Sequence, residues 1–426
     1  MRVQSFAGFT PFASRANQPG GHSRPGPRRT LGVHPGWALS LCPVPRVADP
    51  RPACLVTGIV SPYRREPFRL LAEAEGVEVI AFEDAGPSVP GLAVHATTQA
   101  GAVRLAASGR YRAVIAGLGG RVALPGSYMA ARARGIPFVL WATIWSHPRT
   151  AAHALSYLPT LHLYRAADAV VTYGEHVSRY VEERRGARGR IFVAPQAVDV
   201  AHFGTRVPAA ARAAARERAA GGRAAELLVL FAGRLEREKG IEVLLRAWRI
   251  ASLGAGARLA IAGEGPLDGA VRTAVPEAQL LGNVPAADLP ALYAAADVLV
   301  LPSIKTATFT EPWGLVVNEA MLQCTPVLVS DAVGAAAGGL VRDGRNGLVF
   351  PAGDATALAA RLSALAADPG LRARLGEAGR EDAARLTPAA WVLGVRRALA
   401  SVGAAAPQPL ASVAAAAPQP REPAGD

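Results

Sequence analysis

Residues 298–321 read VLVLPSIKTATFTEPWGLVVNEAM and contain a short apolar run, a loop and a helix-like stretch, in that order. The run Val298–Leu301 is typical of a buried strand, and a helical pattern starts near Gly314. A strand followed by a helix is the unit of a parallel sheet, because parallel strands need crossover connections. The stretch also carries two carboxylates, Glu311 and Glu319, eight residues apart.

The same alternation extends in both directions along the chain. It predicts an α/β protein with two Rossmann-like domains, each built on a parallel sheet, and ligand binding at the carboxyl ends of the strands in a central cleft. The other predicted strands are 53–58, 77–82, 113–116, 137–142, 169–172, 191–193, 227–231, 259–262, 278–281, 326–329 and 348–350.

Composition sets the segment boundaries. Residues 1–50 hold six arginines and one acid among many Pro and Gly residues, which predicts a disordered extension. Residues 403–426 are a low-complexity, disordered tail. Between them, the predicted segments are a first domain (51–203), an Ala- and Arg-rich linker (204–225), a second domain (226–387) and a terminal amphipathic helix (388–402).

Length and charge narrow the class of protein. A chain of 426 residues that is 50% hydrophobic can bury the cores of two domains. The net charge of +13 suggests an anionic partner. Nucleic acid, a membrane surface and a phosphorylated substrate all meet this description, and charge alone does not choose among them. The three cysteines, Cys42, Cys54 and Cys324, lie far apart, so neither a disulfide framework nor a zinc site is indicated and a cytoplasmic location fits best. We see no run long enough to span a membrane, so any membrane association is expected to be peripheral.

Two cations stand where an anion is expected to bind. Gly233 and Arg234 follow the strand 227–231, and Lys239 lies at the start of the next helix. A helix N-terminus already favours an anion, and a guanidinium and an ammonium strengthen that preference, so the pattern suits a diphosphate. The alternative interpretation is that residues 234–239 are a solvated run of charges.

The carboxylate pair fits the other parts of the same ligand. Glu311 lies outside the mouth of the helix that begins near Gly314, and Glu319 lies one to two turns inside it. A nucleotide sugar has a matching layout, with hydroxyl-bearing ribose and sugar on either side of a diphosphate. The pair also admits general acid/base hydrolysis, and a plain helix-capping role for Glu311 with a surface role for Glu319.

Together these motifs resemble the retaining glycosyltransferases with an E-x7-E motif, called glycosyltransferase family 4. The resemblance rests on FAGRLEREKG (231–240), IAGEGP (261–266), LLGNVPAADLPALYAAADVLVLPS (280–303), EPWGLVVNEAM (311–321) and VRDGRNGLVFPAGD (341–354). It covers essentially the whole second domain. It implies the GT-B fold, in which the first domain takes the acceptor, the second takes the donor and the terminal helix crosses back to the first domain.

The resemblance also implies a role for each site residue. Arg234 and Lys239 would hold the donor diphosphate, Glu311 the transferred sugar and Glu319 the ribose. Backbone at Gly233, Gly314, Leu315 and Val316 would contact the donor, and Val284 would lie at the edge of the nucleobase. In the first domain, His147 in TIWSHP is the candidate that would orient the donor sugar or the acceptor.

The reaction that the resemblance implies is transfer of a hexose-type sugar with retained configuration, for polysaccharide, glycolipid or glycoconjugate synthesis. No protein nucleophile, cofactor or metal is expected. The spacer Ile-Lys-Thr-Ala-Thr-Phe-Thr (304–310) is longer than usual and leaves the sugar open.

The predicted partners are a nucleotide sugar and a saccharide or lipid-linked acceptor, with no nucleic acid. An anionic membrane surface, the inner face of the cytoplasmic membrane, is a further expectation. It rests on first-domain cations, which solvated arginines explain equally well: Arg132, Arg134, Arg149, Arg165, Arg179, Arg184, Arg185, Arg188 and Arg190. Three alternatives stay open, namely a nucleotide-sugar epimerase, a non-catalytic nucleotide-sugar-binding protein and a nucleic-acid-binding protein.

Overall fold

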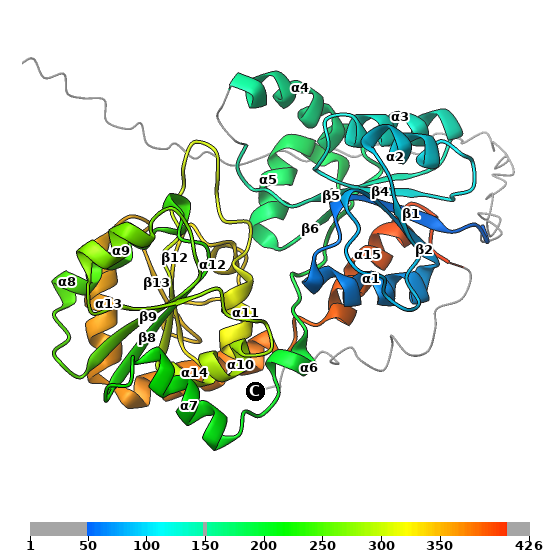
Figure 1. Cartoon of the computed structure of the whole chain (residues 1–426). Coiled ribbons are helices and arrows are strands. Elements are labelled where there is room, and N and C mark those ends of the chain that lie inside the picture. Colours follow the sequence, from blue (N-terminus) through cyan, green and yellow to red (C-terminus); the bar gives the residue numbers. More distant parts are fainter. Residues whose placement is uncertain (1–48, 148–150, 407–426) are drawn as a thin grey trace, which may run out of the picture. The chain divides into compact units, whose positions relative to one another are not determined.

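A computed structural model describes residues 49–147 and 151–406, and the side chains of residues 151–155 are outside this description. The predicted extension therefore lies outside the described residues up to position 48, and the predicted tail from position 407. Both predicted sheets are present, and every strand pair within them is parallel. Figure 1 shows each sheet with helices on both of its faces.

The first sheet has seven strands in the order β3-β2-β1-β4-β5-β6-β7. Most of its strands are runs of buried apolar residues, as expected for a sheet covered on both faces. The strands are β1 (Ala53–Ile59), β2 (Val77–Asp84), β3 (Val94–Ala96), β4 (Val114–Gly117), β5 (Phe138–Ala142), β6 (Ala169–Thr172) and β7 (Ile191–Val193). The helices of this part are α1 (Pro62–Glu75), α2 (Gln99–Ala106), α3 (Ala123–Arg134), α4 (Ala151–Ala166), α5 (Glu175–Arg185), the short η1 (Gly186–Arg188) and α6 (Val200–Phe203).

The second sheet has six strands in the order β10-β9-β8-β11-β12-β13. They are β8 (Leu227–Ala232), β9 (Ala257–Ala262), β10 (Gln279–Gly282), β11 (Val298–Leu301), β12 (Val327–Ser330) and β13 (Leu348–Phe350). Strand β8 shows the two-sided burial clearly, because Leu228 and Leu230 pack into one core cluster while Val229 and Phe231 pack into another.

The helices of the second domain cover both faces of this sheet (Figure 1). Helix α8 packs on α13, and α10 packs on α7 and α11. The bounds are α7 (Ala209–Ala219), the short η2 (Arg237–Lys239), α8 (Ile241–Ala251), α9 (Asp268–Ala274), α10 (Leu289–Ala295), α11 (Leu315–Leu322), α12 (Gly334–Ala337), α13 (Ala355–Ala367) and α14 (Pro369–Ala383).

Helix α15 (Pro388–Ser401) returns to the first domain, as predicted, and packs on α1, β6 and β7. Trp391 is fully buried against Phe68 and Trp141, with ring centroids 5.7 Å from each. The buried Glu75 carboxylate fixes the helix, because it accepts a hydrogen bond from Arg396 Nε at 2.7 Å and pairs with Arg112 Nη2 at 3.1 Å. Two segments of the chain that are distant in sequence therefore share one core.

Several boundaries differ from the sequence prediction. The segment predicted as a linker contains α7, and Arg216 of that helix pairs with Asp297 at 2.7 Å beside β11. The predicted tail starts too early, since Ala404 is buried and the Ala406 amide donates to Glu75 Oε2 at 2.7 Å. Strand β3 was not predicted, and helix α4 was predicted without bounds.

Candidate functional site

The candidate site lies where the order of the second sheet reverses. Strand β8 has β9 on one side and β11 on the other, so a crevice opens at the carboxyl ends of β8 and β11. Gly240 brings Lys239 to this point. The φ angle of Gly240 is +70°, and a Cβ added to Gly240 would lie 1.9 Å from the Pro302 carbonyl oxygen at the end of β11. Only glycine permits this approach, so the cation is held beside the strand end.

A cavity of about 380 Å³ lies at this crevice. Seven of the predicted site residues line it: Gly233, Arg234, Lys239, Glu311, Gly314, Leu315 and Val316. The first domain supplies a second wall, which consists of Tyr63, Thr143, Tyr173 and Gln196. The remaining described lining residues come from the second domain and are Ala232, Leu301, Pro312 and Trp313. The cavity is thus formed by both domains, with most of the predicted residues on one wall.

Glu311 is buried at the centre of a charged cluster. Its Oε2 atom is 2.5 Å from Lys239 Nζ and accepts a hydrogen bond from Ser303 Oγ at 3.1 Å. The Ser303 hydroxyl is itself completely buried. Removing a carboxylate and an ammonium from water is costly unless the two compensate each other, so Lys239 and Glu311 hold each other in place.

Arg234 differs from Lys239 in exposure, because 60% of the Arg234 side chain is exposed to solvent against 15% of the Lys239 side chain. Arg234 pairs with Glu236 and lies 3.7 Å from Glu238 Oε1. Part of the predicted charge run is therefore an exposed local network, in which each contact contributes little. Residues 234–239 therefore combine the two interpretations, a solvated run of charges and an anion site, since Arg234 and Lys239 also line the cavity.

The N-terminus of α11 contributes backbone donors to the cavity. The helix begins at Leu315 with Gly314 as its N-cap, and Gly314 has a φ of +90°. A Cβ at Gly314 would lie 2.6 Å from Leu301 Cδ2, so glycine is required for this turn. The first N–H groups of a helix have no partner within the helix, and those near Leu315 and Val316 adjoin the cavity.

Glu319 lies outside the described lining of the cavity. Its Oε2 atom accepts a 2.6 Å hydrogen bond from the hydroxyl of buried Tyr293. Burial raises the pKa of Glu319 to about 7, partly opposed by that hydrogen bond and by His202. Val284 is also absent from the described lining residues and is partly buried against the core.

His147 is not among the described residues that line the cavity. Its ring contacts Tyr157 edge-on, with centroids 5.1 Å apart. A different histidine, His176, reaches the predicted motif. It is buried, its Nε2 atom is 3.1 Å from the Pro312 carbonyl oxygen, and burial lowers its pKa to about 4, so it donates as a neutral ring. The sequence interpretation missed His176, although it closely follows β6.

The long loop before Glu311 makes contact with the first domain. Trp145 Nε1 donates to the Glu311 carbonyl oxygen at 3.1 Å, and the Ser146 and Thr310 hydroxyls lie 3.0 Å apart. Lys305 Nζ lies 4.6 Å from the Trp145 ring centroid. The lengthened spacer therefore contacts the segment after β5 and closes one edge of the site.

The first-domain wall was largely missed from sequence. Thr143 and Tyr173 directly follow β5 and β6, and Gln196 follows β7 closely. All three are therefore at carboxyl ends of strands, the signal that found the residues of the second domain. Trp313 and Gln196 are linked through Asn318, which accepts from Trp313 Nε1 at 2.8 Å and donates to the Gln196 carbonyl at 3.2 Å.

Many of the first-domain cations have local partners. Arg132 pairs with Asp168, and buried Arg185 donates to the carbonyls of Tyr164 and Ala167 at 2.7 and 2.9 Å. Arg149 lies outside the described residues. Among the described residues, no helix combines the length and apolar character that crossing a membrane requires.

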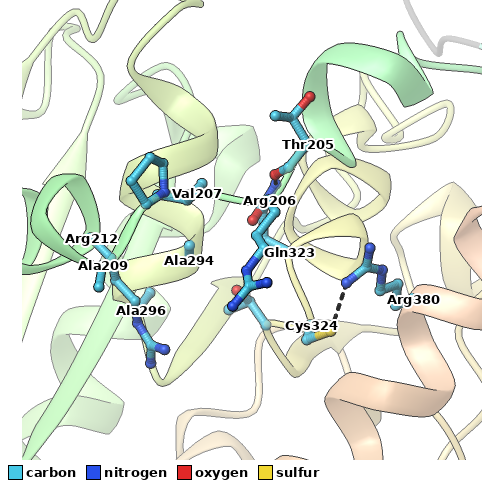
Figure 2. Close-up of a pocket in the computed structure, with 12 residues that line it drawn as sticks. Thr205, Arg206, Val207, Ala209, Arg212, Ala294, Ala296, Gln323, Cys324 and Arg380 are labelled. Atoms are coloured by element: carbon cyan, nitrogen blue, oxygen red, sulfur yellow. Dashed lines mark hydrogen bonds between the residues drawn. The ribbon is translucent and has the colours of Figure 1, made fainter.

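A larger cavity of about 660 Å³ lies elsewhere, between the segment that precedes α7 and the end of α11. Figure 2 shows Arg206 and Arg380 at this cavity, with Arg380 Nη1 3.8 Å from Cys324 Sγ. None of the predicted site residues is among the described residues that line it. Size alone therefore does not identify the candidate site.

Comparison with known proteins agrees with this geometry. Residues 215–382 match the family model described as Glycosyl transferases group 1. The second domain is therefore similar to the glycosyl transferases group 1 family. The match spans every predicted donor-site residue, from Gly233 to Glu319.

Curated relatives of this chain carry glycosyltransferase names. The chain is 36% identical over 239 residues to the D-inositol 3-phosphate glycosyltransferase of Xylanimonas cellulosilytica, covering 52% of this chain and 54% of the relative. It is 34% identical over 227 residues to that of Pseudarthrobacter chlorophenolicus, covering 50% of each. The chain therefore spans about half the length of the curated relatives it matches.

Solved structures resemble a larger part of the chain. Anabaena Alr3699/HepE in complex with UDP-glucose has a TM-score of 0.66 at 19% identity, covering 82% of this chain and 100% of that chain. Sucrose-phosphate synthase from Thermosynechococcus elongatus has a TM-score of 0.64 at 21% identity, covering 81% and 97%. The predicted GT-B fold is thereby confirmed.

Proposed function

We propose that the protein is a retaining glycosyltransferase that moves a hexose-type sugar from a nucleoside diphosphate to a hydroxyl acceptor. The observation that carries the proposal is the cavity at the β8/β11 crevice, where Lys239, Glu311 and the N-terminus of α11 converge. The group 1 match and the names of the relatives support it. HepE, which shares the fold, has been crystallised with UDP and with UDP-glucose, so we use UDP-sugars first.

Donor binding would rearrange the charged cluster. In the described structure the Lys239 ammonium pairs with Glu311. A diphosphate in the cavity would attract that ammonium and the exposed Arg234 guanidinium, and the α11 N–H groups would add donors. Glu311 would then be free to accept hydrogen bonds from sugar hydroxyls, so one ligand would replace both halves of the ion pair.

The chemistry needs stabilisation of the departing diphosphate more than a nucleophile from the protein. In the retaining mechanism that the family resemblance implies, the acceptor hydroxyl attacks from the face that the nucleotide leaves, and a phosphate oxygen takes the hydroxyl proton. Lys239 and Arg234 would stabilise the developing charge, and the cavity walls would position the two substrates. The described residues contain no group of three or more His, Cys, Asp or Glu side chains placed to hold a metal ion. Metal independence stays a prediction.

The decisive experiment incubates the protein with UDP-, GDP- and TDP-sugars and follows nucleotide release and product by mass spectrometry. We expect Lys239→Met to lower the rate by about 10²–10³-fold, the loss typical of one charge-stabilising contact. Arg237→Met is the matched control, because Arg237 is an exposed cation of the same run that is absent from the described lining. Equal losses in the two variants would favour a solvated charge run and contradict the proposal.

The same assay separates the alternatives. Sugar isomers formed without acceptor would indicate an epimerase, and nucleotide binding without turnover would indicate a non-catalytic protein. A salt-dependent gel shift would indicate nucleic-acid binding.

We place the enzyme in the cytoplasm, acting peripherally at the inner face of the membrane in polysaccharide, glycolipid or glycoconjugate synthesis. Support comes from α4, in which 71% of Leu158 is exposed and Arg165, seven residues later, donates to the Arg184 carbonyl oxygen. Flotation with anionic vesicles should carry the protein upward, and Leu158→Asn should weaken the effect.

A further inference from the structure

Arg64 occupies an unfavourable position for a cation. It lies in the first turn of α1, is 3% exposed, and has no acidic residue in that turn. Burial removes water from the guanidinium, and the positive end of the helix dipole repels it. A residue that is this costly for stability is a candidate for function.

Aromatic rings surround the Arg64 guanidinium. Its Cζ atom lies 4.5 Å from the ring centroid of Trp141, 5.0 Å from Tyr63, 5.2 Å from Tyr173 and 5.8 Å from Trp391. Its Nη2 atom donates to the Tyr173 hydroxyl at 2.8 Å. Ring faces attract a cation, but they do not neutralise its charge.

The cluster is rich in donors and poor in acceptors. Among the described residues, Arg64 Nη1 and the indole nitrogens of Trp141 and Trp391 are buried without a hydrogen-bond partner. No carboxylate of the described chain forms an ion pair with Arg64. Buried polar groups normally find partners, so this cluster is electrostatically incomplete.

The two other arginines that are buried among the described residues differ in this respect. Arg112 pairs with the Glu75 carboxylate, and Arg185 donates to backbone carbonyls that include those of Tyr164 and Ala167. Both are satisfied by the protein itself. The contrast indicates that the acceptor missing at the Arg64 cluster is supplied by a ligand.

Tyr173 connects the cluster to the cavity. It lines the cavity, and burial raises the pKa of its hydroxyl to about 12, so it stays protonated. Because Arg64 donates to the Tyr173 oxygen, the phenolic proton is free to be donated elsewhere. On the same wall, Gln196 Oε1 has no hydrogen-bond partner among the described residues and would accept from a hydroxyl.

We propose that Arg64 and Tyr173 form an oxyanion-recognising unit on the first-domain wall, in which Tyr173 touches the ligand and Arg64 positions and polarises it. The ligand class is a phosphate that neighbours free hydroxyls, which matches both Tyr173 and Gln196. This phosphate belongs either to the donor diphosphate or to a phosphorylated acceptor. The proposal rests on the proposed function only in assigning the ligand to these two sources.

The test uses Arg64→Met and Tyr173→Phe, which remove the charge and the hydroxyl but keep most of the packing. Calorimetry measures the affinity of each variant for UDP, for uridine, and for inorganic phosphate with and without saturating UDP. We expect each variant to lose about tenfold in affinity for a phosphate-bearing probe and nothing for uridine, and the double variant to lose no more than either single.

The probe that loses affinity identifies the source. Loss of UDP affinity assigns the unit to the donor diphosphate. Loss of phosphate binding to UDP-saturated protein, with UDP affinity unchanged, assigns it to the acceptor. If the wild-type protein binds no nucleotide, the proposed function fails, yet phosphate binding to the free protein still reports on Arg64.

Arg185→Met is the control for a purely structural arginine. We expect it to lower the melting temperature and leave all affinities unchanged, because its carbonyl partners lose their donor. Arg64→Met should keep or raise the melting temperature, since an apolar side chain suits a buried site without a counterion. A lowered melting temperature in Arg64→Met with every affinity unchanged would overturn the proposal.

Discussion

Glu311 and Glu319 come from one motif, but their surroundings differ in kind. The Glu311 carboxylate is buried against an ammonium, 2.5 Å from Lys239 Nζ, and borders the cavity. The Glu319 carboxylate is buried against the neutral Tyr293 hydroxyl and lies outside the described lining. Burial raises the pKa of Glu319 to about 7, and the hydrogen bond from Tyr293 opposes this rise only in part.

This difference assigns different tasks to the two ends of the motif. Glu311 forms part of a charge cluster that a diphosphate sugar would reorganise during the reaction. Glu319 is a weakly compensated acceptor whose charge depends on pH near neutrality. The first should therefore affect turnover, and the second should affect donor affinity.

Exchanging each carboxylate for an amide should give the largest effect. Glu311→Gln is expected to lower kcat by about 10²-fold, because it removes the charge that positions both Lys239 and the sugar. Glu319→Gln should mainly raise the Kd for UDP, by about tenfold, with a small change in kcat. Steady-state kinetics and calorimetry on the same preparations measure both quantities. The comparison would break down if the two variants showed the same pattern.

The prediction of these residues from sequence worked where function follows directly from neighbours in the chain. The Glu311–Glu319 spacing, the Lys239-Gly240 pair and the apolar strands are local, and the fold brings the cavity-lining residues among them together. The hydrogen bond that Glu319 accepts from Tyr293 could not be predicted, because Tyr293 is a residue of another helix.

The first domain was less predictable for the same physical reason. The Arg64 guanidinium contacts the rings of Tyr173 and Trp391, which are remote from it in sequence, so its surroundings could not be predicted. The alternation predicted helices between the first-domain strands without bounds for α4, a helix that contains Pro159. His176 carries no motif of its own, and its contact with Pro312 arises only in the folded chain.

A pH titration should reveal the raised pKa of Glu319. The folded state keeps a proton on Glu319 up to a pH of about 7, whereas the unfolded chain releases it near 4.5. The Glu319 contribution to the free energy of unfolding is therefore full below pH 4.5 and falls by about 2–3 kcal/mol as the pH rises through 7. Urea unfolding measures the free energy of unfolding of Glu319→Gln and of the wild type at pH 5 and pH 7.5. Between these two pH values, the difference between the proteins should shift by that amount in favour of Glu319→Gln.

His176 acts in the opposite direction and explains why the paired comparison is needed. Burial lowers its pKa from 6.5 to about 4, so its contribution to stability is present above pH 6.5 and is lost as the pH falls toward 4. The two groups partly cancel in the wild type, and only the difference between wild type and Glu319→Gln isolates the carboxyl. A pH-independent difference would contradict the protonation of Glu319 at pH 5.

Removing the Tyr293 hydroxyl should have the smallest effect and sharpen the distinction further. Tyr293→Phe deletes the 2.6 Å hydrogen bond to Glu319, and we expect it to lower the free energy of unfolding by about 1 kcal/mol. It should also move the Glu319 transition to higher pH, because that hydrogen bond lowers the pKa of the carboxyl. The Thr325 hydroxyl bonds the Tyr293 carbonyl, so the backbone anchor of α10 survives the change. Kinetics at a pH well above the shifted transition should be near wild type, since Glu319 is then ionised in both proteins. A loss of donor affinity as large as that of Glu319→Gln would instead show that the Tyr293 hydroxyl binds the donor directly.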